Sequence, residues 1–222
     1  MINLTINDQK VEVEEGAMIL EATKTLRIDI PTLCYHKALS AYGACRLCIV
    51  EISAGKRPWI ATSCTYPVQE GLVVQTHSER VLKSRRIVIE LLLARCPDSQ
   101  QLKDLAKELG LTRIRLRPKN EDCTLCGLCV RMCNERMGIS AVSFVNRGSR
   151  RRVIPPFDTL SDICQTCGAC VSICPTGKIK IDEISKNKPI LISRLVFYKS
   201  QVYTPYFKYP NTPWASLLIG PD

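Results

Sequence analysis

The chain has 222 residues, of which 45% are hydrophobic and 23% charged, and its 31 basic and 21 acidic residues leave a formal net charge of +10. This composition is ordinary for one or two globular domains and excludes wholesale disorder. The longest apolar run, at 87–94, is interrupted by Glu90 and is far shorter than the ~20 residues of a membrane span, so we expect no integral membrane segment.

Thirteen residues are cysteine. Because this number is odd, the cysteines cannot all pair into disulfides within one chain. The N-terminus lacks the basic and apolar regions of a signal peptide, so we expect a reducing, cytoplasmic location, where clustered thiols usually bind metal.

Residues 1–77 have the pattern of a β-rich unit. Apolar and polar residues alternate on both sides of the turn signal Asn7-Asp8, which predicts an N-terminal hairpin. The expected elements are strands at 2–6 and 11–13, a helix over 17–26, and strands near 50–52 and 72–74. Together they predict an α+β fold in which a long loop carries Cys34 to Cys48.

Residues 78–119 read as a helical connector. Ser78 is a plausible N-cap for a helix over 78–94, and a second short helix is expected over 99–109, ended by Gly110. The connector then continues as a basic strip that contains Arg113, Arg115, Arg117 and Lys119.

Residues 120–185 contain an internal repeat. Two runs read C-x2-C-x2-C-x3-C, and every cysteine of the first run recurs 41 positions later in the second. Three cysteines spaced in this way wrap one tight loop around three corners of an Fe4S4 cube, and the fourth iron takes a thiolate from the other run. The two runs together predict a tandem 2[4Fe–4S] ferredoxin-like domain. Its ligands would be Cys123, Cys126, Cys129 and Cys174 for cluster A, and Cys164, Cys167, Cys170 and Cys133 for cluster B.

Zinc is the alternative metal for these runs. Structural zinc sites usually combine two distant C-x2-C pairs around one tetrahedral ion, whereas each run here supplies three ligands from one loop. The tandem spacing therefore favours iron–sulfur clusters over zinc, disulfides or free thiols.

The remaining cysteine group reads C-x10-C-x2-C-x15-C. Plant-type [2Fe–2S] ferredoxins use C-x4-C-x2-C with a distant fourth ligand, so the two patterns share a loop with several cysteines and one late cysteine. Small residues at Gly43 and Ala44 would let backbone N–H groups approach the sulfurs. The spacing favours a [2Fe–2S] cluster and leaves zinc open. The four candidate ligands are Cys34, Cys45, Cys48 and Cys64.

Several segments resemble a known family. They read IPTLC at 30–34, GACRLCIVE at 43–51, ATSC at 61–64, ISAVSFVNRG at 139–148 and CPTG at 174–177. They are similar to the N-terminal part of the large iron–sulfur subunit of respiratory complex I, to the accessory region of iron-only hydrogenases and to the diaphorase part of NAD-linked hydrogenases and formate dehydrogenases. The resemblance covers about residues 1–185 and implies a β-grasp fold for the [2Fe–2S] domain.

One departure from that family lies in the connector. Members often carry a His-x3-C-x2-C-x5-C site for a further [4Fe–4S] cluster after the first long helix, whereas this chain has only Cys96 there. We therefore expect one [2Fe–2S] and two [4Fe–4S] clusters, with Cys96 as a buried structural thiol.

The resemblance implies an electron-transfer subunit of a multisubunit NAD(P)-linked oxidoreductase, such as a hydrogenase or formate dehydrogenase complex, which could bifurcate electrons. Its expected partners are a flavin- and NAD(P)-binding subunit and a catalytic subunit or ferredoxin. The chain has no dinucleotide fingerprint, Walker loop or acid–base constellation, so we expect no catalytic residue in it. The alternatives are a free-standing polyferredoxin and, more remotely, a zinc-dependent structural or nucleic-acid-binding module.

Positive charge alone would suggest nucleic acid as a partner. Three oxidised clusters would carry about −6 and reduce the net charge to about +4, and no nucleic-acid motif accompanies the basic strips at 113–119 and 147–152, so we expect no nucleic-acid binding. The last segment, 186–222, is rich in aromatic residues and proline, and we expect it to be an arm that packs on a neighbouring subunit, with a disordered terminus as the alternative.

Overall fold

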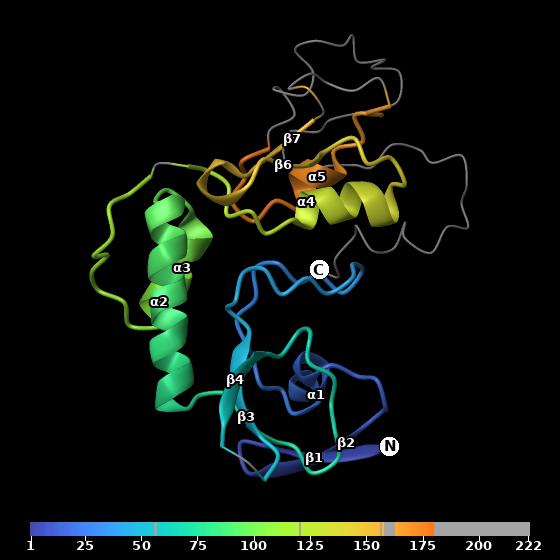
Figure 1. Cartoon of the computed structure of the whole chain (residues 1–222), viewed down its shortest axis with the longest axis vertical. Coiled ribbons are helices and arrows are strands. Elements are labelled where there is room, and N and C mark those ends of the chain that lie inside the picture. The colour runs from blue at the N-terminus through green and yellow to red at the C-terminus, as the bar shows by residue number, and fades with distance from the viewer. Residues whose placement is uncertain (56, 120, 156, 158–162, 180–222) are drawn as a thin grey trace. The chain divides into compact units, whose positions relative to one another are not determined.

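The computed structural model describes residues 1–55, 57–119, 121–155, 157 and 163–179 (Figure 1). The described residues form two compact units, the first within residues 1–36 and 40–127 and the second from residues 37–39 and the described part of the chain after 127. The predicted C-terminal arm at 186–222 lies outside the described residues. Within the described ranges, no helix is both long and apolar enough to cross a membrane.

A mixed five-stranded sheet forms the base of the first unit, with the strand order β2-β1-β5-β3-β4. The strands are β1 (Ile2–Ile6), β2 (Gln9–Val13), β3 (Ile49–Ser53), β4 (Trp59–Thr62) and β5 (Val73–Gln75). Strands β1 and β5 are parallel, and the other neighbouring pairs are antiparallel. Asn7 and Asp8 have φ values of 45° and 66°, the two left-handed residues that a tight primed turn requires, so the predicted hairpin is confirmed.

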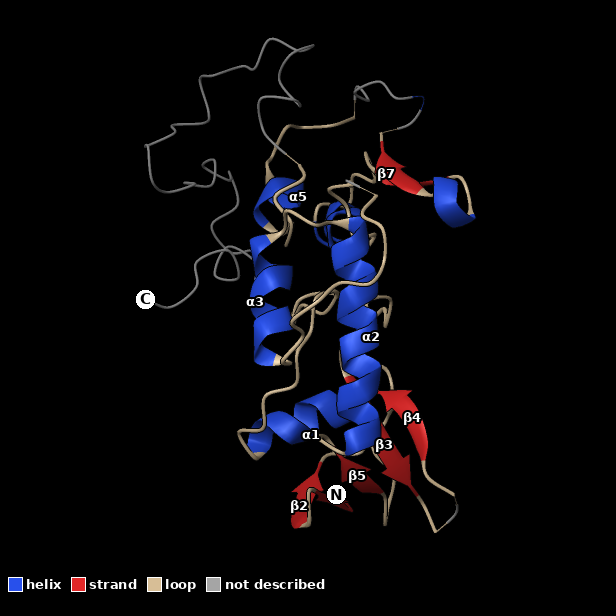
Figure 2. Ribbon diagram, turned by 90° about the vertical axis from the view of Figure 1, so that its left-hand side faces the viewer, coloured by secondary structure: helices blue, strands red, loops and turns tan. Residues whose placement is uncertain are grey.

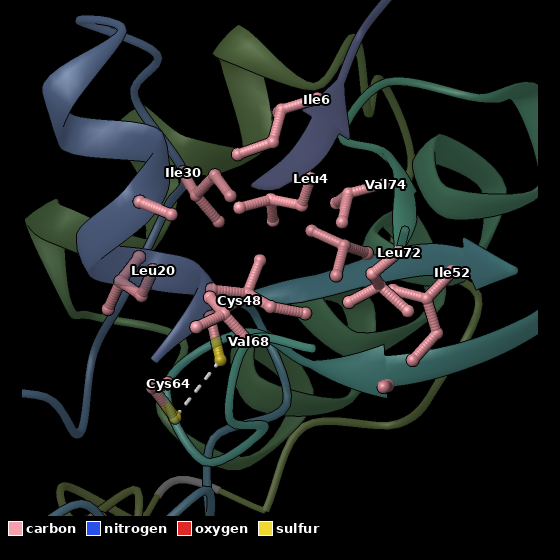
Figure 3. Packing of buried hydrophobic residues seen from close by; sticks show 14 of the residues in the cluster. Leu4, Ile6, Leu20, Ile30, Cys48, Ile52, Cys64, Val68, Leu72 and Val74 are labelled. Atoms are coloured by element: carbon pink, nitrogen blue, oxygen red, sulfur yellow. Dashed lines mark hydrogen bonds between the residues drawn. The ribbon is translucent and has the colours of Figure 1, made fainter. Parts of the chain in front are cut away.

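The hydrophobic core of the first unit lies between the sheet and α1 (Ile19–Thr25) (Figure 3). Ile6, Ile19 and Ile52 are fully buried in this core. Side chains on a strand alternate between its two faces, so Val50 and Ile52 of β3 enter the core together, whereas Glu51 lies on the opposite face. The α+β fold expected for this part of the chain is confirmed.

Two helices follow the sheet, α2 (Glu79–Arg95) and α3 (Gln100–Glu108). The backbone N–H of Val81 donates to Ser78 Oγ at 3.3 Å, which confirms Ser78 as the N-cap. Helix α2 contacts β3 and α3, and Figure 2 shows α3 running beside α2. Figure 1 places α1 and α2 on opposite sides of β3 and β4. Helix α2 therefore packs on the face of β3 that carries Glu51, where Arg80 Nη1 lies 3.2 Å from Glu51 Oε1.

The second unit repeats a short structural motif. Helices α4 (Leu128–Arg131) and α5 (Ala169–Ser172) begin 41 residues apart, contact each other, and both contact the π-helical turn η1 (Met132–Arg136). A two-stranded antiparallel sheet of β6 (Ser143–Val145) and β7 (Arg152–Ile154) completes the described part of this unit. The sequence repeat is thus also a repeat of secondary structure.

Candidate metal centres

The four cysteines of the first group are all buried, at 1–6% exposure, in the first unit. Cys34, Cys45 and Cys48 come from the loop between α1 and β3, and Cys64 follows β4. Cys48 Sγ and Cys64 Sγ lie 3.2 Å apart, a contact drawn in Figure 3. Cys34 and Cys45 are also hydrogen-bonded to each other through their side chains. The four thiols therefore lie as two pairs.

The loop before Cys45 directs backbone N–H groups at sulfur. Gly43 has a φ of +65°, and a Cβ at this position would lie 3.2 Å from Thr65 Cγ2, so both the backbone conformation and the space favour glycine. Beyond this turn, the N–H of Cys45 donates to Cys34 Sγ at 3.4 Å, and the N–H of Ala44 also donates to that sulfur. The approach of backbone N–H groups that Gly43 and Ala44 predict is confirmed.

Pairing of the thiols shifts their acidity. The hydrogen bond between Cys34 and Cys45 lowers the pKa of Cys45 to about 6 and raises the pKa of Cys34. In the second pair, the hydrogen bond between Cys48 and Cys64 lowers the pKa of Cys48 to about 7 and raises the pKa of Cys64. In each pair the hydrogen bond therefore favours the thiolate of one cysteine, the form of cysteine that binds metal.

This arrangement fits a two-iron cluster, because each pair of thiols could supply the two protein ligands of one iron. The donor set is all cysteine, the sulfurs lie pairwise, and backbone N–H groups already point at them. Within the part of the chain that the structure describes, no three His, Cys, Asp or Glu side chains are grouped to hold a single metal ion.

A second candidate centre is a cavity in the second unit. It is lined by Cys133, Cys164, Cys167 and Cys170, the four cysteines that the sequence predicts as ligands of cluster B. Apolar side chains such as Met137, Ile139 and Val142 complete its wall. One described cavity thus collects a cysteine from the first run and three from the second, as the exchange of fourth ligands between runs requires.

Burial and neighbouring thiols disfavour the thiolate form of cysteine in this cavity. Burial raises the pKa of Cys170 to about 11, and repulsion by the neighbouring thiols Cys167, Cys133 and Cys164 adds to the effect. Burial, followed by the repulsion of Cys133 and Cys164, also raises the pKa of Cys167. Bound iron would supply the positive charge that stabilises the thiolate forms. The N–H of Ala141 donates to Cys133 Sγ at 3.2 Å, so one sulfur of the cavity already accepts a backbone hydrogen bond.

The cysteines predicted for cluster A are divided between the two units. Cys123 and Cys126 belong to the first unit, and Cys129 and Cys174 to the second. The backbone around the middle cysteine of each run repeats. Leu125 and Gly127, which flank Cys126, have φ values of 57° and 73°, and the residues that flank Cys167 also have positive φ, 51° at Thr166 and 74° at Gly168. The two loops thus follow the same left-handed path, as two copies of one cluster-binding motif should.

Two arginines of α2 were missed by sequence reasoning. Arg85 is only 1% exposed and donates to the carbonyl oxygens of Leu47 and Ile49, the neighbours of Cys48. Arg95 donates to the Cys123 carbonyl oxygen at 2.6 Å and pairs with Glu121. The available signal for Arg85 was its position four residues from Val81 and Ile89, on the apolar face of the helix. Cys96, at the end of the same helix, is buried as expected, and burial raises its pKa to about 12.

Comparison with known protein families supports both kinds of centre. Residues 1–79 match a family described as a 2Fe-2S iron-sulfur cluster binding domain, and residues 122–178 match a family described as a 4Fe-4S dicluster domain. The fold class is therefore a [2Fe–2S] ferredoxin domain followed by a 4Fe–4S dicluster domain.

Similar proteins belong to NAD(P)-linked redox enzymes. The NADP-reducing hydrogenase subunit HndD of Solidesulfovibrio fructosivorans is 37% identical over 81% of this chain and 36% of its own length. The NADPH-Fe(3+) oxidoreductase subunit alpha of Geobacter sulfurreducens is 37% identical over 97% of this chain and 25% of its own length. A subunit of the NADH-quinone oxidoreductase of Rhizobium meliloti is 32% identical over 81% of this chain and 24% of its own length. The chain thus spans about a third or less of the curated relatives it matches.

A solved structure extends the similarity to three dimensions. A chain of an NAD+-reducing [NiFe]-hydrogenase, crystallised in its H2-reduced state, is 30% identical with a TM-score of 0.62. The match covers 70% of this chain and 75% of the hydrogenase chain.

Proposed function

Because the chain belongs to the family of iron–sulfur proteins that includes subunits of NAD(P)-linked hydrogenases and of NADH-quinone oxidoreductases, we propose that it relays electrons one at a time through one [2Fe–2S] and two [4Fe–4S] clusters. The observation that carries the proposal is the collection of Cys133, Cys164, Cys167 and Cys170 around one cavity, which joins the two repeated runs as a dicluster ferredoxin requires.

The ligand sets follow from the sequence pattern and fit the thiols that the structure describes. Cys34 and Cys45 would hold one iron of the [2Fe–2S] cluster, and Cys48 and Cys64 the other. The four cysteines around the described cavity would hold cluster B. For cluster A we propose the remaining ligands of the two runs, Cys123, Cys126, Cys129 and Cys174.

When bound, the clusters would supply one-electron transfer, and no protein residue would change its covalent structure. The chain's own contribution is to hold the thiolates, to exclude water from them by burial, and to point backbone N–H groups at the sulfurs. The backbone N–H of Cys45 donates to Cys34 Sγ, and the backbone N–H of Ala141 donates to Cys133 Sγ. Both hydrogen bonds stabilise negative charge on the sulfur. Such hydrogen bonds and the burial of the site are the protein's means of setting a cluster potential.

The partners in this proposal are a flavin- and NAD(P)-binding subunit on one side and a catalytic subunit or ferredoxin on the other. These partners are what the family resemblance implies, and they are supported by similar proteins that are named as a subunit of an NADP-reducing hydrogenase and a subunit of an NADH-quinone oxidoreductase. The domain boundaries and the cytoplasmic location stay predictions of the sequence.

A matched pair of cysteine variants tests the [2Fe–2S] assignment. Cys64 and Cys96 are both 1% exposed, so Cys64→Ala and Cys96→Ala remove equally buried thiols. After anaerobic expression or reconstitution, Cys64→Ala should lose the two-iron cluster and keep the four-iron signals in EPR of the reduced protein. Cys96→Ala should keep every signal. Equal cluster content in the two variants would remove Cys64 from the ligand set.

Native purification tests the assignment as a subunit. In anaerobic size-exclusion chromatography, the iron-containing chain should elute with other subunits, and NADH or NADPH should reduce its clusters in that complex and not in the isolated chain. Elution of all the native protein as a single ~25 kDa species would favour the free-standing polyferredoxin instead.

A further inference from the structure

Arg85 of α2 is a fully buried cation. It is 1% exposed and lies between Val81 and Ile89 on the helix face that packs against the sheet unit, where both neighbours are completely buried. Burial lowers the pKa of Arg85 to about 10, so that the guanidinium stays charged at neutral pH. A charged group is rarely found in such a position unless something compensates it.

The guanidinium is fixed against the loop that carries Cys48. Arg85 Nε donates to the Leu47 carbonyl oxygen at 3.1 Å, and Arg85 Nη2 donates to the Ile49 carbonyl oxygen at 2.7 Å. These carbonyls belong to the residues immediately before and after Cys48. The planar fork of arginine thus clamps both flanks of a proposed cluster ligand.

The two carbonyl groups accept hydrogen bonds from Arg85 but carry no net negative charge to balance the guanidinium. Among the described residues, no carboxylate forms an ion pair with Arg85, although Arg80, Arg95 and Arg115 of the same unit each have one. Two titratable groups interact with the charge of Arg85. The negative charge of a Cys48 thiolate favours the charged form of the guanidinium. The pKa of His77 is lowered by burial and, to a smaller extent, by the positive charge of Arg85. A buried charge that lacks a partner would be strongly destabilising.

We infer that Arg85 is the counter-cation of the [2Fe–2S] cluster and a positioning residue for its ligand Cys48. This inference rests on the proposed function, because the compensating negative charge is that of the cluster. A two-iron cluster with four thiolates carries about −2 when oxidised and about −3 when reduced. The guanidinium therefore stabilises the reduced form more than the oxidised form and raises the reduction potential of this cluster.

Two substitutions separate the charge of Arg85 from its hydrogen bonds. Arg85→Gln removes the charge and keeps one donor for a carbonyl, whereas Arg85→Lys keeps the charge and loses the planar fork. An EPR-monitored redox titration of the full anaerobic chain measures the potential of each cluster. We expect Arg85→Gln to change the reduced-to-oxidised ratio of the [2Fe–2S] cluster at fixed potential by at least tenfold toward the oxidised form. For a one-electron couple this change is a lowering of about 59 mV. Arg85→Lys should lower the potential of the [2Fe–2S] cluster by less than half of the change caused by Arg85→Gln.

Arg80→Gln is the matched control. Arg80 lies five residues earlier in α2, but its side chain is 55% exposed and pairs with Glu51. Solvent and salt screen such a charge, so its removal should change the ratio by less than threefold. The [4Fe–4S] potentials should stay unchanged in all three variants.

The outcomes distinguish this inference from the proposed function. A chain without any two-iron signal would overturn the proposed function. A normal two-iron signal whose potential is the same in Arg85→Gln and the native chain, or equally shifted in Arg85→Gln and Arg85→Lys, would overturn only the counter-cation inference.

A further measurement needs no variant and covers the case in which the substituted chains do not take up the cluster. In native protein labelled with 15N-arginine, the Arg85 Nε–H should exchange slowly with solvent, and its NMR signal should shift or broaden when the [2Fe–2S] cluster is reduced. The absence of any slowly exchanging guanidinium signal that responds to reduction would refute the inference.

Discussion

Gly43→Ala is the substitution that most directly probes the loop around the proposed two-iron site. Gly43 has a φ of +65°, and the added Cβ would lie 3.2 Å from Thr65 Cγ2. Two costs therefore act at one position. The first is the left-handed backbone, which is unfavourable for an L-residue, and the second is a close contact with a side chain that must move.

The magnitudes follow from the two costs. A left-handed conformation costs an L-residue about 1–2 kcal/mol. A contact that forces its neighbour to shift adds about 1–3 kcal/mol. At about 2–4 °C per kcal/mol for a chain of this size, Gly43→Ala should lower the apparent Tm by about 4–20 °C.

Gly55→Ala separates the two costs. Gly55, in the turn after β3, has a φ of +66°, but nothing lies within 4 Å of a Cβ built there. Its substitution should carry the backbone cost alone and lower the apparent Tm by about 2–8 °C. Anaerobic thermal unfolding, followed by the visible circular dichroism of the clusters, measures both variants. Adding Thr65→Ser, which removes the Cγ2 methyl, should recover the part of the loss that is specific to Gly43.

Two results would refute this reasoning. Equal Tm values for Gly43→Ala and Gly55→Ala would show that the approach of Thr65 is not tight. A double variant, Gly43→Ala with Thr65→Ser, that is no more stable than Gly43→Ala would show that the methyl group is not its cause.

Two further predictions concern α2. Arg115 donates to the buried Glu90 carboxylate from its guanidinium and its backbone N–H, and these hydrogen bonds lower the pKa of Glu90 in the folded state. The pair therefore stabilises the fold fully above the ordinary carboxyl pKa, near 4.5, and this contribution is lost as the pH falls through the lowered pKa. Glu90→Gln should reduce the apparent Tm at pH 7. It should also weaken the fall of the apparent Tm below pH 4.5. Identical profiles of Tm against pH for the native chain and Glu90→Gln would contradict this prediction. Arg95 donates to the Cys123 carbonyl oxygen, so Arg95→Met should speed the loss of [4Fe–4S] iron to a chelator several-fold and leave the [2Fe–2S] cluster unaffected. Arg86→Met is its control, since Arg86 donates to the Leu109 carbonyl instead, and equal chelation rates in the two variants would argue against the clamp on Cys123.

Local signals in the sequence were sufficient for much of the fold. The hairpin of β1 and β2 follows from two alternating strands and a turn that tolerates left-handed backbone at Asn7 and Asp8. Helix α2 follows from its cap and its apolar stripe. The dicluster motif was readable because three ligands of each cluster lie within one short loop and the loop is repeated.

Features that depend on distant partners were not readable. Strand β4 has only four residues and is stabilised by pairing with β3, so its own sequence carries little signal. The pairing of Cys48 with Cys64 depends on where β3 and β4 place their ends, which spacing alone does not reveal. Arg85 lies on the apolar face of α2, which is a signal of burial, but only the packing of α2 against β3 shows that it lies beside a proposed ligand.

The central claim is that twelve of the thirteen cysteines hold three clusters. The most direct test is the iron and acid-labile sulfide content of the anaerobically purified chain, combined with Mössbauer spectroscopy of 57Fe-enriched protein. We predict about ten iron and about ten sulfide per chain, with about one fifth of the spectral area in a [2Fe–2S] component and the rest in [4Fe–4S] components. Stoichiometric zinc without sulfide, or iron without a two-iron component, would contradict the account.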